Sequence, residues 1–153
     1  HILDTDSRWM AEAIAEAKKG QANGGIPIGS VLVSDGRIIG KGHNQRVQGN
    51  NPILHAEMVA IQNAGRLRAS TYSKSTMYTT LSPCTMCAGT IILYKIPRVV
   101  IGENLTIQDL TLCEDWLVSH GVTVVNLNLQ ECIGLMQNFI ANSPDIWNED
   151  VGV

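Results

Sequence analysis

The 153-residue chain is poor in aromatic side chains, which make up 5% of its residues and include a single phenylalanine. It lacks any apolar run near the ~18–20 residues that a membrane-spanning helix needs, so we expect no membrane association. Its four cysteines are too few to indicate a disulfide scaffold in a chain of this size. No segment has the charged and then apolar pattern of a signal peptide, so we expect a cytoplasmic protein.

Basic residues are missing from the last 55 positions. All eleven lysines and arginines lie at or before Arg98, alongside six acids, which gives residues 1–98 a net charge of +5. Residues 99–153 contain eight acids and no lysine or arginine, a net charge of −8. Nucleic-acid phosphates are bound mainly by lysine and arginine, so we expect no nucleic-acid partner.

The remaining composition is that of a folded protein. Hydrophobic residues make up 44% of the chain and charged residues 16%, which is enough apolar material for a core and argues against disorder. A length of 153 residues fits one ordinary domain, which we expect to span residues 1–153.

Hydrophobic periodicity and turn residues predict the order α-β-β-α-β-α-β-α-β-α. Asp35-Gly36 predicts a hairpin between the first two strands, Gly20 is expected to end the first helix, and Pro83 to open the third. Strands joined by helices at this spacing indicate a largely parallel sheet covered by helices on both faces. Because the first pair is an antiparallel hairpin, the sheet should be mixed. The predicted helices are 7–19, 55–63, 83–94, 109–120, 130–141 and a short one in the tail; the predicted strands are 28–33, a second through 38–39, 75–80, 98–102 and 122–127.

Two short segments carry residues that bind metals: His55-Ala56-Glu57 and Pro83-Cys84-Thr85-Met86-Cys87. Each segment alone is a weak signal, since a Cys-x-x-Cys pair also occurs in redox sites and structural zinc sites. Together they supply one imidazole, two thiols and one spare carboxylate. Cys84 and Cys87 share a face of a helix start, where the positive helix end favours the thiolate that binds metal.

Two helix N-termini could therefore converge on one ion, with His55, Cys84 and Cys87 as ligands. Three protein ligands leave the fourth tetrahedral position open, as in catalytic zinc sites, and Glu57 is then a base beside the ion. The alternative is a closed structural zinc site completed by Cys113 or Cys132. Those two cysteines lack the Cys-x-x-Cys spacing, so we expect both to be small buried hydrophobic residues.

This paired signature is that of the zinc-dependent nucleobase deaminases. Over residues 8 to 151 the sequence resembles the fungal-type cytosine deaminases of the cytidine and deoxycytidylate deaminase superfamily. The segments that carry the resemblance are Gly24-Gly25-Ile26-Pro27-Ile28-Gly29, Gly42-His43-Asn44, Leu54-His55-Ala56-Glu57, Tyr78-Thr79-Thr80-Leu81-Ser82-Pro83-Cys84-Thr85-Met86-Cys87, Ile96-Pro97-Arg98, Gly102-Glu103-Asn104 and Trp147-Asn148-Glu149-Asp150.

The resemblance implies a three-layer α/β/α fold with a central mixed five-stranded sheet, a homodimer, and one Zn²⁺ per chain. It implies hydrolysis of a small-molecule nucleobase, cytosine, to uracil and ammonia, with Glu57 moving protons. The implied substrate contacts are Asn44 on the pyrimidine amide edge, the Ala56 backbone N–H facing the substrate carbonyl, the Ser82 carbonyl and Asp150 at the amine, Ile28 on the pocket floor and Trp147 in a C-terminal lid.

The sequence departs from the family at several positions near the implied pocket. Val47, Ile107 and Asn148 stand where the family carries aromatic residues, and Ala56 stands in place of a glycine. Loss of a ring weakens stacking on a flat base by about 0.5–1.5 kcal/mol per pair. The alternative substrates are therefore isocytosine, a purine base or a modified pyrimidine. More distant alternatives are a tRNA adenosine deaminase and a non-catalytic zinc-stabilised module.

For two other histidines and two other tryptophans we expect only structural roles. His43 is expected to lie in a turn or the core, and His120 to interact with the C-terminal end of its helix. Trp9 and Trp116 fall on apolar helical faces, so we expect both in the core.

Overall fold

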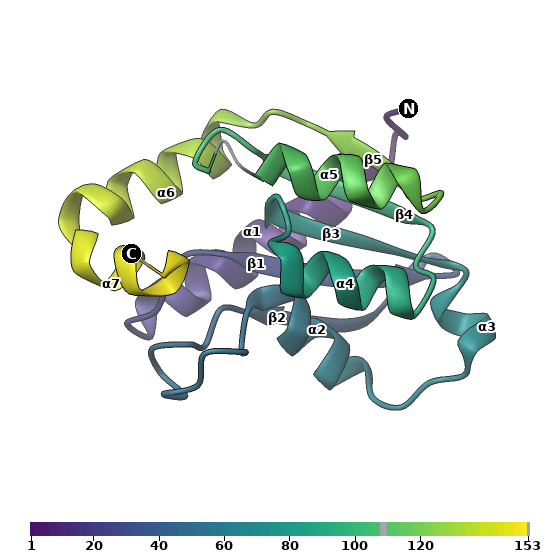
Figure 1. Cartoon of the computed structure of the whole chain (residues 1–153), viewed down its shortest axis with the longest axis horizontal. Coiled ribbons are helices and arrows are strands. Elements are labelled where there is room, and N and C mark those ends of the chain that lie inside the picture. The colour runs from purple at the N-terminus through teal and green to yellow at the C-terminus, as the bar shows by residue number, and fades with distance from the viewer. Residues whose placement is uncertain (108–109, 153) are drawn as a thin grey trace.

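The computed structural model describes residues 1–107 and 110–152. Within them the chain forms five strands and seven helices (Figure 1). All five predicted strands are present: β1 Gly29–Ser34, β2 Arg37–His43, β3 Ser75–Leu81, β4 Arg98–Glu103 and β5 Thr123–Asn126. The helices are α1 Asp6–Ala22, α2 Ala56–Ala64, α3 Ala69–Tyr72, α4 Thr85–Leu93, α5 Leu110–Ser119, α6 Gln130–Asn142 and α7 Pro144–Val151.

The strands form one sheet in the order β2-β1-β3-β4-β5. β1 is antiparallel to both β2 and β3, whereas β3, β4 and β5 are parallel neighbours. The mixed five-stranded sheet is confirmed: β2, β3, β4 and β5 all run in the same direction, and β1 alone runs against both of its neighbours. The reason is that α2 carries the chain from the edge strand β2 across β1 to β3. β1 therefore lies between two strands that both run against it.

The β1–β2 hairpin turns at the predicted Asp35-Gly36 pair. Both residues have positive φ, 55° and 72°. This is the type I′ geometry, whose twist matches that of the flanking strands. The hairpin places β1 inside the sheet, where all six of its residues are buried.

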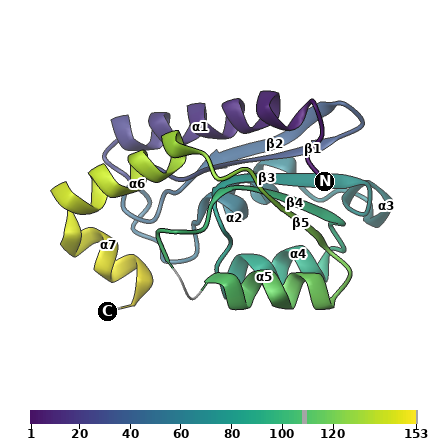
Figure 2. The same cartoon turned by 90° about the horizontal axis from the view of Figure 1, so that it is seen from above.

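Helices cover both faces of the sheet, so the three-layer α/β/α architecture is confirmed. α1 and α6 lie on one face, and α2, α4 and α5 lie on the other (Figure 2). Met10 of α1 packs with Val31 and Val100 on the first face. Ile91 of α4 and Leu117 of α5 are fully buried in a second cluster on the opposite face.

The helix α2 lies unusually close to β2, at a point where the strand has two glycines. A Cβ on Gly42 would lie 2.5 Å from Cγ1 of Val59, and a Cβ on Gly40 would lie 2.3 Å from the carbonyl oxygen of Ala60. These distances are too short for a side chain, so α2 packs directly on the strand backbone. The position of the N-terminus of α2 is therefore set by contact with the β2 backbone.

Two predicted helix ends are wrong. Gly20 lies inside α1, where its missing side chain makes room for the ring of His43, whose Cδ2 would be 2.8 Å from a Cβ. Pro83 does not occupy the first position of α4, because Cys84 is the N-cap and Thr85 begins the helix. The predicted start of the next helix at Asp109 lies outside the described residues.

Trp116 is a further correction. It was expected in the core, but it is 39% exposed, on α5 close to Gly89 of α4. α4 and α5 pack side by side over the same face of the sheet, so a side chain on their outer side finds no covering layer.

Trp9 is buried as predicted, and Nδ1 of His120 lies 3.0 Å from the Trp116 carbonyl at the helix end. The four-residue helix α3 was not predicted.

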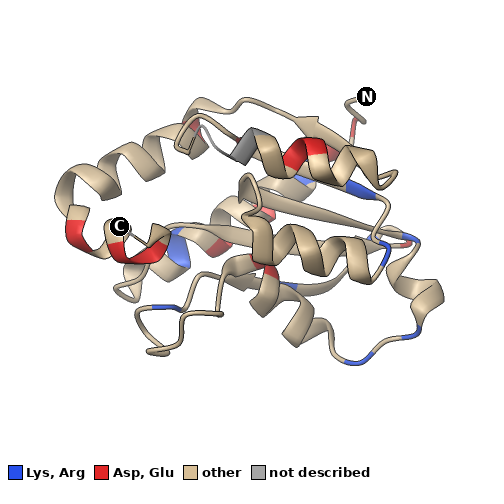
Figure 3. Cartoon of the chain, in the orientation of Figure 1, with Lys and Arg blue, Asp and Glu red and all other residues tan. Residues whose placement is uncertain are grey.

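Among the described residues, none of the helices combines the length and the apolar character that crossing a bilayer requires. Acidic residues cluster on α7, as the charge-coloured view shows (Figure 3). The C-terminal helix thus carries Asp145, Glu149 and Asp150 and no lysine or arginine.

Candidate active site

His55 and Cys84 are the N-cap residues of α2 and α4, and both have extended backbone conformations. The N-termini of these two helices meet, so that Nδ1 of His55 lies 3.5 Å from Sγ of Cys84. Cys87, in the first turn of α4, completes a group of three donors that lie within 4.8 Å of one another. The structure therefore brings together the three predicted ligands.

The donor geometry fits zinc. With Zn–N and Zn–S bonds of about 2.0–2.3 Å, two ligands of a tetrahedral ion lie about 3.6 Å apart. The observed separation between Nδ1 of His55 and Sγ of Cys84 is 3.5 Å. The other ring nitrogen, Nε2, faces the carboxylate of Asp150 at 3.8 Å. A carboxylate beside the outer nitrogen of a ligating histidine is a common arrangement that fixes the ring orientation.

The two cysteines differ in protonation, because the pKa of Cys84 is lowered and that of Cys87 is raised. A hydrogen bond from the Cys87 thiol outweighs burial and, with the hydrogen bond to His55, lowers the pKa of Cys84 to about 4. The same hydrogen bond and burial raise the pKa of Cys87. One sulfur is thus held as the thiolate that metals bind.

Glu57 lies in the first turn of α2 and is 4% exposed. Burial and the negative charge of Cys84 raise its pKa to about 7, against an opposing effect of His55. A carboxyl group with a pKa near neutrality can both accept and return a proton at pH 7. Glu57 does not belong to the three-donor group, so its carboxylate is available for proton transfer.

A cavity of about 440 Å³ lies against these groups. Apart from Cys87, which is fully buried beneath it, every residue predicted to form the site lines its wall: Ile28, Asn44, His55, Ala56, Glu57, Ser82, Cys84, Trp147 and Asp150. The wall also contains residues that were not predicted as substrate contacts: Leu81, Thr85, Met86, Ile107, Cys113 and Val151. Of the three positions where the family carries aromatics, only Ile107 lines the cavity.

The side chain of Asn44 has a defined orientation. Its Oδ1 accepts a hydrogen bond of 3.0 Å from the backbone N–H of Arg46. Its Nδ2 is buried and has no hydrogen-bond partner among the described residues. Buried amides are normally satisfied, so this free donor on a cavity wall fits a ligand that offers an acceptor.

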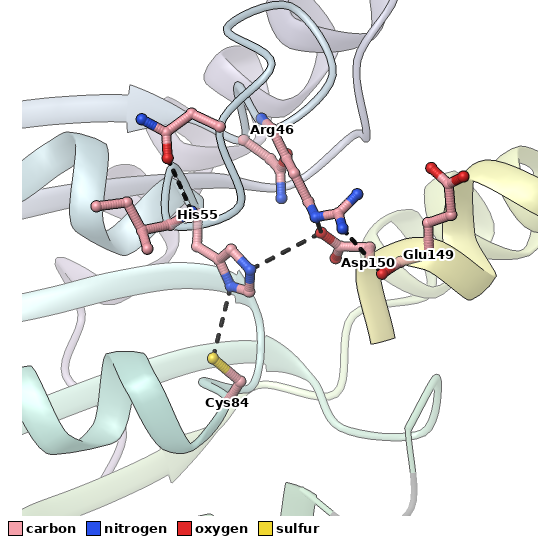
Figure 4. A network of polar contacts seen from close by, with 8 residues as sticks. Arg46, His55, Cys84, Glu149 and Asp150 are labelled. Carbon is pink, nitrogen blue, oxygen red and sulfur yellow. Dashed lines mark hydrogen bonds and ion pairs between the residues drawn. The ribbon is translucent and has the colours of Figure 1, made fainter. Parts of the chain in front are cut away.

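The helix α7 closes one side of the cavity with Trp147 and Asp150. The side chain of Asp150 is 5% exposed, so this carboxylate lies inside the protein and not on its surface. Burial raises the pKa of Asp150, against the opposing positive charges of His55 and Arg46. Its Oδ1 lies 3.3 Å from Nε of Arg46, and Arg46 also donates to the carbonyl of Glu149 at 3.0 Å (Figure 4).

Arg46 is not among the residues predicted from the sequence. The only signal for it was its position two residues after Asn44, because its contacts on α7 lie more than a hundred residues away along the chain.

The two remaining cysteines are buried, as predicted. Cys132 packs on the opposite face of the sheet with Trp9 and Met10, far from the three-donor group. Cys113 lines the cavity but does not join that group. Within the described residues, neither cysteine completes a closed four-ligand site.

Ser82 is held beside the cavity by two polar contacts. Its N–H donates to the carbonyl of Glu103 at 3.0 Å, and its hydroxyl donates to Oε2 of Glu114 at 2.8 Å. The hydroxyl hydrogen of Ser82 is thus already donated to Glu114, and the backbone carbonyl of Ser82 remains as an acceptor for a ligand.

The sequence has close relatives among known proteins. It is 51% identical to a cytosine deaminase of Candida albicans over 96% of this chain and 97% of that one. It is 38% identical to a tRNA-specific adenosine deaminase of Streptococcus pyogenes over 91% of this chain and 85% of that one. A solved structure from work on A-to-I editing by tRNA:A34 deaminases superposes with a TM-score of 0.71 at 28% identity, covering 84% of this chain and 99% of that one.

A family model described as the cytidine and deoxycytidylate deaminase zinc-binding region matches residues 3–103. The matched segment contains the imidazole, both thiols and Glu57. The chain therefore belongs to the zinc-dependent family of cytidine and deoxycytidylate deaminases, hydrolases that act on C–N bonds.

Proposed function

We propose that this protein hydrolyses free cytosine to uracil and ammonia, and that residues 1–153 form one catalytic domain. The observation that carries the choice of substrate is the 51% identity, over nearly the whole of both chains, to a cytosine deaminase. The cavity supports a small ligand, because its volume of about 440 Å³ suits a single base and is lined mainly by apolar groups with a few polar ones.

In this proposal His55, Cys84 and Cys87 hold one zinc ion per chain. When bound, zinc acts as a Lewis acid that lowers the pKa of a coordinated water toward ~7. The three residues also hold the N-termini of α2 and α4 together, which keeps Glu57 beside the position where the reacting carbon lies.

Glu57 moves the protons of the reaction. Its carboxylate accepts a proton from the attacking water and delivers it to the ring nitrogen next to the reacting carbon. It then takes the remaining proton from the hydroxyl group formed on that carbon and passes it to the exocyclic amine, so that the C–N bond breaks, the C–O bond becomes the new carbonyl and ammonia leaves. Burial keeps its pKa at about 7, which lets one group act first as base and then as acid.

The polar wall of the cavity matches the edge of cytosine. The free Nδ2 of Asn44 donates to the ring carbonyl, as does the backbone N–H of Ala56 at the start of α2. The carbonyl of Ser82 and the carboxylate of Asp150 accept from the exocyclic amine. Ile28 forms the floor, and Trp147 covers the ring.

A second candidate is deamination of another small heterocycle, which Ile107 favours. At this position on the cavity wall the family carries an aromatic residue, so the pocket has lost ring surface that would stack on the base.

tRNA deamination is less well supported despite the 38% identity to a tRNA-specific enzyme. The helix that closes the cavity carries three acids and no lysine or arginine, and would repel phosphates.

The proposal is tested by measuring ammonia release from cytosine, isocytosine, guanine, adenine and creatinine with the purified protein. We expect cytosine to be the best substrate, with one zinc per chain by elemental analysis. Active protein without stoichiometric zinc would contradict the metal assignment. Preference for another base would replace cytosine with the second candidate.

We also propose a homodimer. α4 and α5 present exposed apolar side chains: Leu93 and Leu112 are 69% and 70% exposed, and Trp116 of α5 and Tyr94, the C-cap of α4, are also exposed. A second copy of the chain that buried these residues would remove apolar surface from water, which is the main driving force of association.

A further inference from the structure

Arg46 contacts both sides of the candidate active site. It lies in the loop that joins β2 to α2, two residues after Asn44, and its side chain reaches Glu149 and Asp150 of α7. Its backbone N–H holds the amide of Asn44, while its guanidinium reaches Asp150 and the carbonyl of Glu149. One residue thus contacts both polar groups that we assign to the two ends of the substrate's polar edge.

The guanidinium contacts are of a kind that fixes geometry. Nε of Arg46 lies 3.3 Å from Oδ1 of Asp150, and Nη2 donates to the Glu149 carbonyl at 3.0 Å. The planar fork of arginine can make both contacts at once, and the single ammonium of lysine does so less well. The Arg46 side chain is 23% exposed and that of Asp150 is 5% exposed, so solvent screens this pair less than it screens a surface pair.

The negative charge of α7 strengthens its attraction to the Arg46 guanidinium. The helix carries three acids and no base, and its C-terminal end adds the negative end of the helix dipole. Arg46 therefore places a positive charge where the helix is most negative. Both Arg46 and His55 approach Oδ1 of Asp150 as ion-pair partners, yet this buried oxygen accepts no hydrogen bond from the described residues, so it can accept one from a substrate amine.

We propose that Arg46 is a positioning residue that latches α7 over the cavity and orients Asp150 toward the exocyclic amine. This inference rests on the proposed function for the identity of the amine. Arg46 touches no reacting atom; it acts through Asp150 and through the closed position of the helix.

A latch has a defined kinetic signature. Without the Arg46 contacts, α7 would cover the cavity in only a fraction of the molecules. The apparent affinity for substrate would fall in proportion to that fraction, whereas saturating substrate would draw all molecules into the covered state. We therefore expect Arg46→Met to lower kcat/KM about tenfold or more, the order of one charge-assisted hydrogen bond, with a much smaller loss of kcat. Arg46→Lys should be intermediate, because it keeps the charge and can reach one acceptor at a time.

The experiment compares wild type, Arg46→Met, Arg46→Lys and the control Arg66→Met, each as the whole 153-residue chain loaded with zinc. Arg66 is an exposed arginine on the loop after α2. Steady-state kinetics give kcat and KM, and hydrogen–deuterium exchange followed by mass spectrometry reports on the amides of residues 145–151. We expect faster exchange in α7 for Arg46→Met, with β3 and α4 unchanged, and no effect of Arg66→Met.

The exchange measurement needs no substrate, so it tests the latch separately from the proposed reaction. Unchanged exchange in α7 of Arg46→Met overturns the latch, whichever base proves to be the substrate. A fall in kcat at unchanged KM, or faster exchange throughout the protein, also overturns it, because either shows a general structural role. If the wild type deaminates no base but α7 exchange still rises in Arg46→Met, the proposed function fails and the latch is supported.

Discussion

At the scale of single residues, two buried carboxyl groups have opposite pKa shifts because their neighbours differ. Burial and a nearby thiolate raise the pKa of Glu57 to about 7. Burial also acts to raise the pKa of Asp6, but hydrogen bonds from Arg98, Leu3 and Tyr78 outweigh it and lower that pKa. Glu57 is thus suited to exchange protons, whereas Asp6 is held as a permanent anion that ties α1 to the sheet.

We expect Glu57→Gln to keep its zinc and its affinity for substrate but to lose turnover. The amide preserves the shape of the side chain and cannot carry a proton, and such acid–base roles are worth about 10²–10⁴ in rate. Metal analysis, equilibrium binding of cytosine and kcat check this, with the exposed Glu12→Gln as the matched control. Retention of a tenth of the wild-type rate would show that Glu57 is not the proton carrier.

The Asp6 cluster predicts how stability depends on pH. Nη1 and Nη2 of Arg98 lie 2.8 and 2.6 Å from the two carboxylate oxygens of Asp6. Because the folded pKa of Asp6 lies below its unfolded value near 3.8, the ion pair contributes fully above that pH and is lost as the pH falls through the folded pKa. Asp6→Asn should therefore destabilise the protein by about 3 kcal/mol at pH 7, since it leaves Arg98 partly buried without its anion.

Urea unfolding of both proteins between pH 7 and pH 2.5 measures this difference. The gap between wild type and Asp6→Asn should narrow only below about pH 4, near the unfolded pKa of an aspartate. A gap that stays constant across this range would contradict the assignment.

At the scale of the elements, the site depends on where α2 begins, and the two strand glycines beneath it determine that position. We expect Gly42→Ala to push α2 outward, because the new Cβ would lie 2.5 Å from Val59 and 2.9 Å from the amide nitrogen of Ala60. His55 and Glu57 would move with the helix, so zinc should be released more readily to a chelator.

Gly134→Ala is the matched control for this substitution. Gly134 lies in α6 with no neighbour within 4 Å of a built Cβ, so alanine there should raise stability by about 0.5–1 kcal/mol. Chelator titration and thermal melting compare the two variants. Equal zinc retention in both would mean that the close packing of α2 does not determine the site geometry.

The helix α7 is the second element whose removal is informative. Truncation after Pro144 should leave a folded, zinc-loaded protein with little activity, because Trp147 and Asp150 both line the cavity. Trp147 also belongs to the main apolar cluster, so we expect a lower melting temperature as well. Zinc content, melting temperature and turnover are measured on the same sample, and near-normal turnover below the melting transition would refute the lid.

At the scale of the whole molecule, the strands and the metal donors could be predicted because they depend on local patterns. The Asp35-Gly36 turn and the two metal-binding segments are each contained within a few residues. The insertion of β1 between β2 and β3 and the contact of Arg46 with α7 depend on how distant segments meet, which no local pattern encodes. Trp116 was misplaced for a related reason: helical periodicity identifies an apolar face but not whether another layer covers it.

The exposed face of α4 and α5 predicts the assembly state. We expect the wild type to sediment as a dimer at micromolar concentration, and the double variant Leu112→Glu/Trp116→Glu to sediment as a monomer, because two buried charges would oppose association. Ile53→Glu is the control, since Ile53 is 53% exposed but lies in the loop before α2. A monomeric wild type would count against the dimer.

The tryptophan on α7 has an optical consequence. Trp147 is 7% exposed and lines the cavity, whereas Trp9 is buried on the opposite face of the sheet and Trp116 is partly in water on α5. The indole that covers the pocket is thus an intrinsic fluorophore placed where the base binds. Its emission should change when a base stacks against it and shift to longer wavelength when the helix swings into solvent, so unlabelled protein can report on both occupancy and opening.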